Sequence, residues 1–135
     1  MATITQMRSG IAANLAKING LRTATTVPDV INPPMAIVVP NSITFDRSFK
    51  RGTDEYEFAV LVIASRADER TAQNKIDGYC APTGAGSVKA AIESDRSLGG
   101  VIQDLRVTEM RAYGPADIGG VTYLTAEFVV SVFSQ

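Results

Sequence analysis

The sequence predicts a small α+β domain: a mainly antiparallel sheet with an N-terminal helix and two short helices packed on it. Three observations predict this class. Apolar residues recur at helical spacing near the N-terminus, several later stretches alternate apolar and polar residues, and the other helical stretches are clustered between strands. The chain has 135 residues, 45% of them apolar, and no repeat or linker divides residues 1–135. We therefore expect a single domain with a sizeable core.

The first element is an amphipathic helix expected from about Thr3 to Ile18. Its apolar face consists of residues three or four positions apart: Ile4, Met7, Ile11, Leu15 and Ile18. Thr3 or Thr5 can cap its start, and Asn19-Gly20 supplies a C-terminal stop.

Short strands are expected next. Leu21 to Thr26 is the first, and a loop over Pro28 to Pro34 follows, because consecutive prolines suit neither a helix nor a central strand. Met35 to Val39 is a second strand that Pro40 should end, since proline has no N–H to donate to a ladder. Ile43 to Phe45 is expected as a further, separate strand.

The clearest strand runs from Glu55 to Ser65. Alternation places one apolar set on one face: Tyr56, Phe58, Val60, Val62 and Ala64. The opposite set changes from charged to apolar along the strand: Glu55, Glu57, Ala59, Leu61 and Ile63. The later half of the strand is therefore expected to be covered on both faces. Another subunit, the N-terminal segment or a loop of the same chain can provide that cover.

Two short helices follow. Asp68 is the expected N-cap of the first, which should end near Tyr79 and turn a small set of residues inward: Ala72, Ile76 and Tyr79 or Cys80. Ser87 can cap the second, which runs through Ile92 and should bury Val88, Ala91 and Ile92. A turn at Leu98-Gly99-Gly100 leads out of this helical part.

The chain should finish in an antiparallel hairpin. Val101 to Ala112 contains its first strand, and Val121 to Phe133 is a long second strand with period-two alternation. Between them, Gly114-Pro115 and Gly119-Gly120 are expected to bracket a turn region.

Composition argues against several functional classes. Thirteen basic residues against 14 acidic ones give a net charge of −1, without the basic excess of proteins that grip nucleic acid. Histidine, the commonest general base near neutral pH and the commonest metal ligand, is absent. The single cysteine, Cys80, suits a reducing cytoplasm, and the first residues lack a signal-peptide pattern. No apolar run approaches the roughly 20 residues of a membrane span.

Three local patterns have chemical interpretations, but a structural one is favoured for each. Gly84 to Lys89 precedes a helix, but its glycine spacing matches no phosphate-binding fingerprint, so a turn with a capping serine is the better interpretation. Asp54, Glu55 and Glu57 lack a further ligand at a known metal spacing. Cys80 lacks an activating histidine. We therefore expect no catalytic residue, no metal site and no cofactor.

The charged segment from Asp46 to Asp54 is expected to be a hairpin arm or mobile loop with one large apolar residue. We expect this arm to contact a neighbouring subunit or another part of an assembly. The candidate interface residues are Asp46, Arg47, Phe49, Lys50, Arg51, Asp54, Glu55 and Glu57.

The sequence resembles the tail terminator proteins of actinobacteriophages with long, non-contractile tails. The resemblance covers nearly the whole chain and is carried by MRSGIAANLAKINGLR, TVPDVINPPMAIVVP, FKRGTDEYEFAVLVIASRADERTAQNKIDGY and SVKAAIESDRSLGGVIQDLRVTEMRAYG. None of these segments is a catalytic signature. Their order is that of the family: the helix ending at Asn19-Gly20, the Pro-Pro loop, the Asp54-to-Phe58 strand and the helix start at Ala67.

The resemblance implies a homohexameric ring on the end of the completed tail tube. Such a ring contacts the major tail tube protein, stops tube growth and offers a surface to the head–tail connector, or stopper. It is assembled in the host cytoplasm and stays in the virion at the head–tail junction. DNA passes through its lumen without specific binding. Acidic or neutral polar side chains should line the narrowest part, with Asp54, Glu55 and Glu57 as candidates.

Two other functions remain open from the sequence. The chain can be another head–tail connector component, such as a stopper or adaptor, or a tail-tube subunit, because these are also small ring-formers. A carboxylate-dependent enzyme is a third possibility, and it requires a pocket in which Asp and Glu residues converge.

Overall fold

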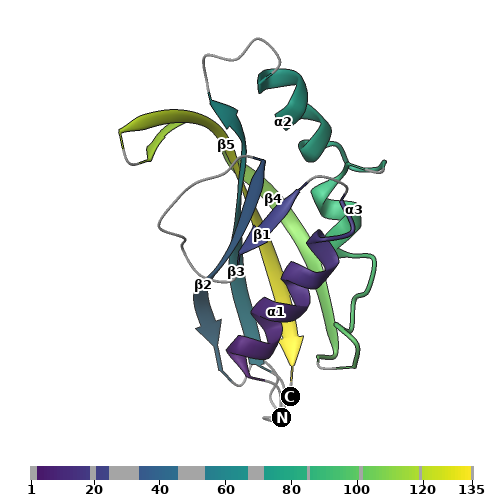
Figure 1. Cartoon of the computed structure of the whole chain (residues 1–135). Coiled ribbons are helices and arrows are strands. Elements are labelled where there is room, and N and C mark those ends of the chain that lie inside the picture. Colours follow the sequence, from purple (N-terminus) through teal and green to yellow (C-terminus); the bar gives the residue numbers. More distant parts are fainter. Residues whose placement is uncertain are drawn as a thin grey trace.

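The structure, a computed structural model, describes residues 3–18, 21–24, 34–45, 54–66, 72–84, 86–100, 102–118 and 120–134. The elements in chain order are α1 (Ile4–Leu15), β1 (Arg22–Ala24), β2 (Met35–Thr44), β3 (Asp54–Arg66), α2 (Ala72–Cys80), α3 (Val88–Ile92), β4 (Asp104–Ile118) and β5 (Val121–Ser134). Five strands form one sheet in the order β1-β2-β3-β5-β4 (Figure 1). Only β1 and β2 pair in parallel. The expected α+β class with a mostly antiparallel sheet is confirmed.

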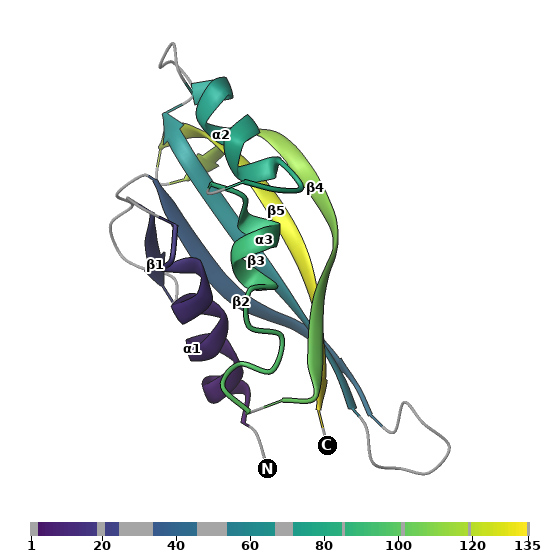
Figure 2. The same cartoon turned by 90° about the vertical axis from the view of Figure 1, so that its right-hand side faces the viewer.

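The three helices cover one face of the sheet, called here the helix side (Figure 2). The helices contribute Met7, Ile11, Leu15, Ile76 and Ile92 to the core. The strands contribute alternate residues, including Val38, Phe58, Val60, Val62, Leu105, Phe128, Val130 and Val132. The face assignment expected for β3 is therefore correct. Burial of each such large side chain contributes about 1.5–3 kcal/mol, so this face supplies most of the stability.

The N-terminal helix begins as the sequence predicts. The Thr3 hydroxyl accepts a hydrogen bond from the Gln6 N–H at 3.1 Å, and the Gln6 side chain accepts one from the Thr3 N–H at 2.9 Å. This reciprocal pair satisfies two backbone donors at the helix start. The helix ends at Leu15, earlier than expected, but Ile18 beyond it is still buried in the core.

The two short helices also follow the predicted pattern. In α2, Ile76 is fully buried, and Tyr79 and Cys80 pack partly buried against the core. The expected cap Asp68 lies outside the described residues. In α3, the Ser87 hydroxyl accepts a hydrogen bond from the Ala90 N–H at 3.1 Å, so Ser87 is the N-cap as predicted.

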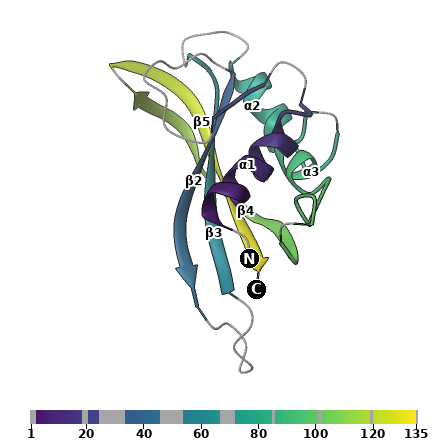
Figure 3. The same cartoon turned by 60° about the horizontal axis from the view of Figure 1, so that its bottom comes forward.

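The opposite face of the sheet, called the outer face, holds a second and smaller core. Met35, Ile37, Ile63 and Tyr123 are buried there, and Ala24, Leu61, Ile118 and Val121 pack against them partly buried. The end of the β4–β5 hairpin bends away from the helices and brings Ile118, Val121 and Tyr123 to this cluster (Figure 3). The apolar half of β3 is therefore covered on both faces, as expected, but among the described residues the cover comes from strands of the same chain and not from a further subunit, the N-terminal segment or a loop.

Pro40 does not end β2, contrary to the sequence prediction. The strand runs from Met35 to Thr44, with a register shift between Pro40 and Ser42, and the separate strand expected at Ile43 is part of it. The parallel pairing with β1 stops at Ile37. Beyond Ile37 no described strand pairs with this side of β2, so the missing N–H of Pro40 leaves no ladder bond unmade.

Gly114-Pro115 is not a turn, which is a second correction. Strand β4 continues to Ile118 and pairs with β5 throughout, with register shifts after Val107 and after Arg111. The second irregularity contains Ala112 at φ 56° and Gly114 at φ 155°. An outermost strand can carry such a bulge and a proline because its second side needs no partner strand.

Candidate functional site

The residues predicted to form the interface fall into two groups. Asp46, Arg47, Phe49, Lys50 and Arg51 lie outside the described residues. The other three stand at the beginning of β3, and they are Asp54, Glu55 and Glu57.

The charged half of the outer face surrounds the start of β3. Glu57 accepts a hydrogen bond from the Asn41 side-chain amide. Further along the same face, the Arg111 guanidinium contacts Glu127 at 3.1 Å and Glu109 at 3.8 Å. The hydrogen bond and the charge of Glu127 raise the pKa of Arg111. Arg106 lies on this half as well, because it pairs with Ser131 beside Glu57. Four carboxylates against two guanidiniums still give this half of the sheet a negative surface; the carboxylates are those of Glu55, Glu57, Glu109 and Glu127.

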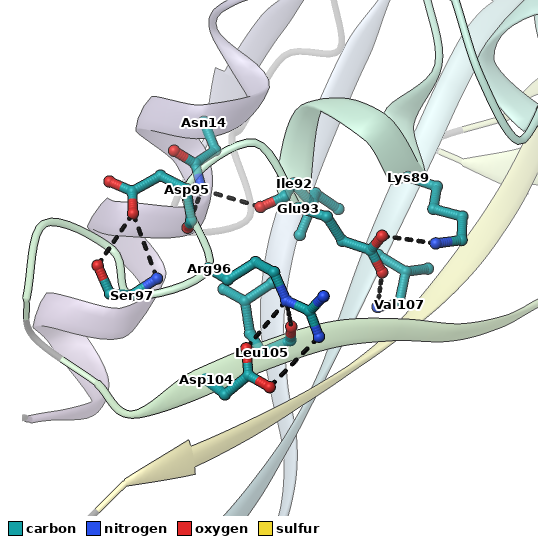
Figure 4. A network of polar contacts seen from close by, with 10 residues as sticks. All are labelled: Asn14, Lys89, Ile92, Glu93, Asp95, Arg96, Ser97, Asp104, Leu105 and Val107. Carbon is teal, nitrogen blue, oxygen red and sulfur yellow. Dashed lines mark hydrogen bonds and ion pairs between the residues drawn. The ribbon is translucent and has the colours of Figure 1, made fainter.

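The beginning of the β4 edge, around Leu105 and Val107, is sealed by two side chains from the segment after α3. The Glu93 carboxylate accepts a hydrogen bond from the Val107 N–H at 2.9 Å (Figure 4). The Arg96 Nε donates to the Leu105 carbonyl at 3.2 Å and to Asp104 at 2.9 Å. These backbone groups point away from β5, so Glu93 and Arg96 occupy the positions that an added strand needs.

A second set of hydrogen bonds holds this segment in place. The buried Asn14 amide of α1 donates to the Ile92 carbonyl at 3.0 Å and to the Asp95 carbonyl at 3.1 Å (Figure 4). The Asp95 carboxylate accepts from the Ser97 hydroxyl at 3.0 Å and from the Ser97 and Gly99 N–H groups at 3.2 and 3.0 Å. These bonds, the one from the Ser97 hydroxyl first, lower the pKa of Asp95. Helix α1 is thereby tied to the loop that positions Glu93 and Arg96.

Beside this seal runs a groove along the helix side of β4, called here the β4 groove. Its apolar part is a hollow of about 200 Å³ lined by Cys80, Pro82, Lys89, Val107, Thr108, Glu109, Met110 and Phe128. Its polar part is a hollow of about 400 Å³ lined by Lys89, Glu93, Arg96, Arg106, Val107 and Thr108. Shared lining residues make the two parts contiguous. Lys89 pairs with Glu93 and Arg96 with Asp104, whereas Arg106 makes no hydrogen bond or ion pair among the described residues.

Exposed large apolar side chains gather at two opposite edges of the sheet. On β2 and just after it, Val39 is 38% exposed and Phe45 is 67% exposed. On β4, Met110 and Tyr113 are each 39% exposed. In the strand order β1-β2-β3-β5-β4, these two pairs lie on different sides of the subunit. The chain therefore carries exposed apolar side chains on two unlike edges, with Val39 and Phe45 on opposite faces of the first edge.

The glycine-rich segment and the cysteine have defined environments in the structure. The Ser87 hydroxyl caps α3 and also donates to the Ala81 carbonyl, so the preceding glycine-rich segment acts as a turn. Burial, followed by the negative charge of Asp77, raises the pKa of the Cys80 thiol and disfavours the reactive thiolate. No group of three potential metal ligands occurs among the residues that the structure describes.

Sequence reasoning missed the groove and its seal. Glu93, Arg96 and Met110 belong to segments that carry no motif, and their roles arise only when β4 is placed beside α3. The one available signal was the polar Asn14 on the buried face of an otherwise apolar helix, because a buried amide requires hydrogen-bond partners.

No protein-family model matches the chain, and no curated protein matches its sequence. Within the described residues, no helix is long and apolar enough to cross a membrane.

Proposed function

We propose that the chain is a structural virion protein whose copies form a ring that caps a phage tail tube. The ring ends tube polymerisation and provides the surface for head–tail joining. The observation that best supports this proposal is the presence of exposed apolar side chains on two opposite sheet edges, Phe45 just after β2 and Met110 with Tyr113 on β4. Head-to-tail rings require a heterologous contact between two different surfaces of the same chain.

The two faces of the sheet suit different sides of such a ring. We place the helix side on the outside of the ring. The opposite face of the sheet, named the outer face above, then lines the lumen. The lumen then receives the carboxylates of Glu55, Glu57, Glu109 and Glu127, which outnumber the guanidiniums of Arg106 and Arg111 on this half of the face. A negative lumen repels the phosphate backbone and lets duplex DNA pass without being trapped.

DNA binding tests this orientation. We expect the purified chain to show no appreciable affinity for duplex DNA at physiological salt in a mobility-shift assay. Tight binding with a steep loss on added salt is the contrary result. It would indicate a DNA-gripping adaptor, because phosphate contacts release counterions and depend strongly on salt.

The partners follow from the resemblance of the sequence to tail terminators. They are five further copies in a hexamer, the major tail tube protein on one side and the head–tail stopper on the other. Assembly takes place in the host cytoplasm and the ring remains at the head–tail junction of the virion. A stopper, an adaptor and a tube subunit are the alternatives, and they differ in where they bind. A terminator binds one end of a finished tube and adds no further layers, whereas a tube subunit continues the tube.

The mass of the purified chain, measured alone and after mixing with tail tubes, tests the ring. We expect a hexamer, formed either in solution or only on a tube end that templates it. Electron microscopy of the mixture should show one added layer at one end of each tube. A chain that stays monomeric even with tube ends present contradicts the proposal, and layers that keep adding favour a tube subunit.

A further inference from the structure

We infer that Phe45 of one copy inserts its ring into the apolar part of the β4 groove of the next copy, beside Met110. This inference rests on the proposed ring and identifies the contact that joins its subunits. The occupant of the groove is thus a second copy of this chain.

The exposed ring and the hollow match in size and chemistry. Phe45 is the most exposed large apolar side chain among the described residues, at 67%. The hollow measures about 200 Å³ and is lined by Cys80, Pro82, Met110 and Phe128 together with more polar neighbours. Thioether sulfur and aromatic rings both pack favourably against a phenyl ring. Insertion therefore covers Phe45 and Met110 in one step.

The two surfaces lie on the same side of the sheet. Ile43 pairs with Tyr56, whose side chain packs against the helix-side core, and alternation gives Phe45 the same direction. The hollow is also on the helix side, since Cys80 and Pro82 line it from the end of α2. Rotation about an axis roughly along the strands keeps the helix side of every copy outward. Phe45 of one copy and the hollow of the next then lie at adjoining edges on the same side of the ring wall.

Phe45 and the hollow lie at different positions along the strand direction. Phe45 lies near the level of Asp54, which pairs with Ser134, while Met110 pairs with Phe128, six residues earlier on β5. At about 3.3 Å per residue, this offset is roughly 20 Å. The four strands β2-β3-β5-β4, about 4.8 Å apart, separate the two surfaces by roughly 14 Å across the sheet. Phe45 of one copy therefore reaches the hollow of the next only when neighbouring copies are offset along the strand direction.

Charges beside the two surfaces are complementary. Asp54 begins β3 at the same end of the sheet as Phe45, and alternation with Glu55 on the outer face places Asp54 on the helix side. The polar part of the groove is lined by the cations of Lys89 and Arg96, and Arg106 lies at its rim, where its side chain alternates towards the outer face. The Asp54 carboxylate is thus brought towards a cationic part of the next copy.

Contact through side chains is favoured over a sheet that continues from copy to copy. At the beginning of β4, Glu93 and Arg96 seal the edge, and register shifts after Val107 and Arg111 interrupt the rest of it. The β2 edge is broken by Pro40 and the register shift beside it. Interrupted edges resist strand addition.

The chain contains a built-in reporter of this contact, because its only cysteine lines the hollow. We expect the Phe45→Cys variant to form disulfides between position 45 of one copy and Cys80 of the next on mild oxidation. Each chain then has two linkable positions, so non-reducing gels should show a ladder beyond the dimer, and peptide mass spectrometry should identify the 45–80 link. The Phe45→Cys/Cys80→Ser double variant has one thiol and should stop at the dimer.

Two further variants test the contact. One tests where the disulfide partner must lie, and the other tests whether Phe45 is needed for association. Val39→Cys lies on the same edge but on the other face, so it should yield at least tenfold less disulfide with Cys80. Phe45→Ala, at an exposed position, should keep the thermal unfolding midpoint of the wild type but associate at least tenfold more weakly. If Phe45→Ala forms rings normally and Phe45→Cys gives no 45–80 link, this contact is refuted while the ring stands. A wild-type chain that never assembles, even on tube ends, refutes both.

Discussion

The two edges of the sheet are both unsuited to adding a strand, but they are protected by different means. On β4, the side chains of Glu93 and Arg96 take up the outward-pointing groups of Val107 and Leu105. On β2, the backbone itself is interrupted, by Pro40 and the adjoining register shift. A side-chain seal can be removed by one substitution or by protonation, whereas an interruption of the backbone remains. The β4 edge is therefore the more vulnerable of the two.

The largest effect is expected from opening the β4 seal. Glu93→Ala leaves the Val107 N–H without its partner and removes the ion-pair partner of Lys89. We expect a loss of about 1–3 kcal/mol in the free energy of unfolding, measured by urea titration, together with faster aggregation. Glu93→Gln is the matched control, because its amide oxygen can still accept from Val107. Its loss should be smaller, and equal losses for the two variants would count against the seal.

The pH dependence of stability should show the same carboxylate. Burial alone would raise the pKa of Glu93, but hydrogen bonds from Lys89 and the Val107 N–H outweigh it and lower that pKa. A carboxyl with a lowered folded-state pKa stabilises the fold above its unfolded pKa of about 4.3 and loses this contribution as the pH falls through the folded value. The stability difference between the wild type and Glu93→Gln should therefore be largest above about pH 5 and shrink towards about pH 3. A difference that stays constant over this range would contradict the assigned role.

The smallest effect is expected at the β2 edge. Pro40→Val restores an N–H, but the neighbouring register shift still interrupts the strand. We expect the free energy of unfolding to change by less than about 1 kcal/mol and aggregation to stay at the wild-type rate. Light scattering at matched concentrations checks this. If Pro40→Val aggregates as fast as Glu93→Ala, proline and not the bulge is the protecting feature.

Local patterns predicted the elements whose environment is set by one periodicity. The buried face of α1, the two faces of β3 and the Ser87 cap of α3 all follow from the spacing of residues along one segment. Pro40 and Gly114-Pro115 were misjudged because their cost depends on whether a second strand lies beside them, which only the strand order determines. Proline is tolerated wherever its missing N–H faces no partner.

The candidate site was less accessible to prediction. The β4 groove joins residues from α2, α3, β4 and β5, and no single segment carries a pattern that marks it. Of the predicted interface residues, Glu55 and Glu57 do share the outer face, but the arm before Asp54 lies outside the described residues. The role of all of them in assembly stays a prediction.

The most direct test of the account is whether unlike edges of two copies join. Phe45→Ala disables one surface and Met110→Arg, which places a charge in the apolar hollow, disables the other. Under conditions where the wild type forms rings, each variant alone should remain monomeric by mass measurement. A 1:1 mixture should give a heterodimer and nothing larger, because one intact Phe45 then meets one intact groove. Rings formed by either variant alone, or a mixture that stays monomeric, would contradict the head-to-tail contact.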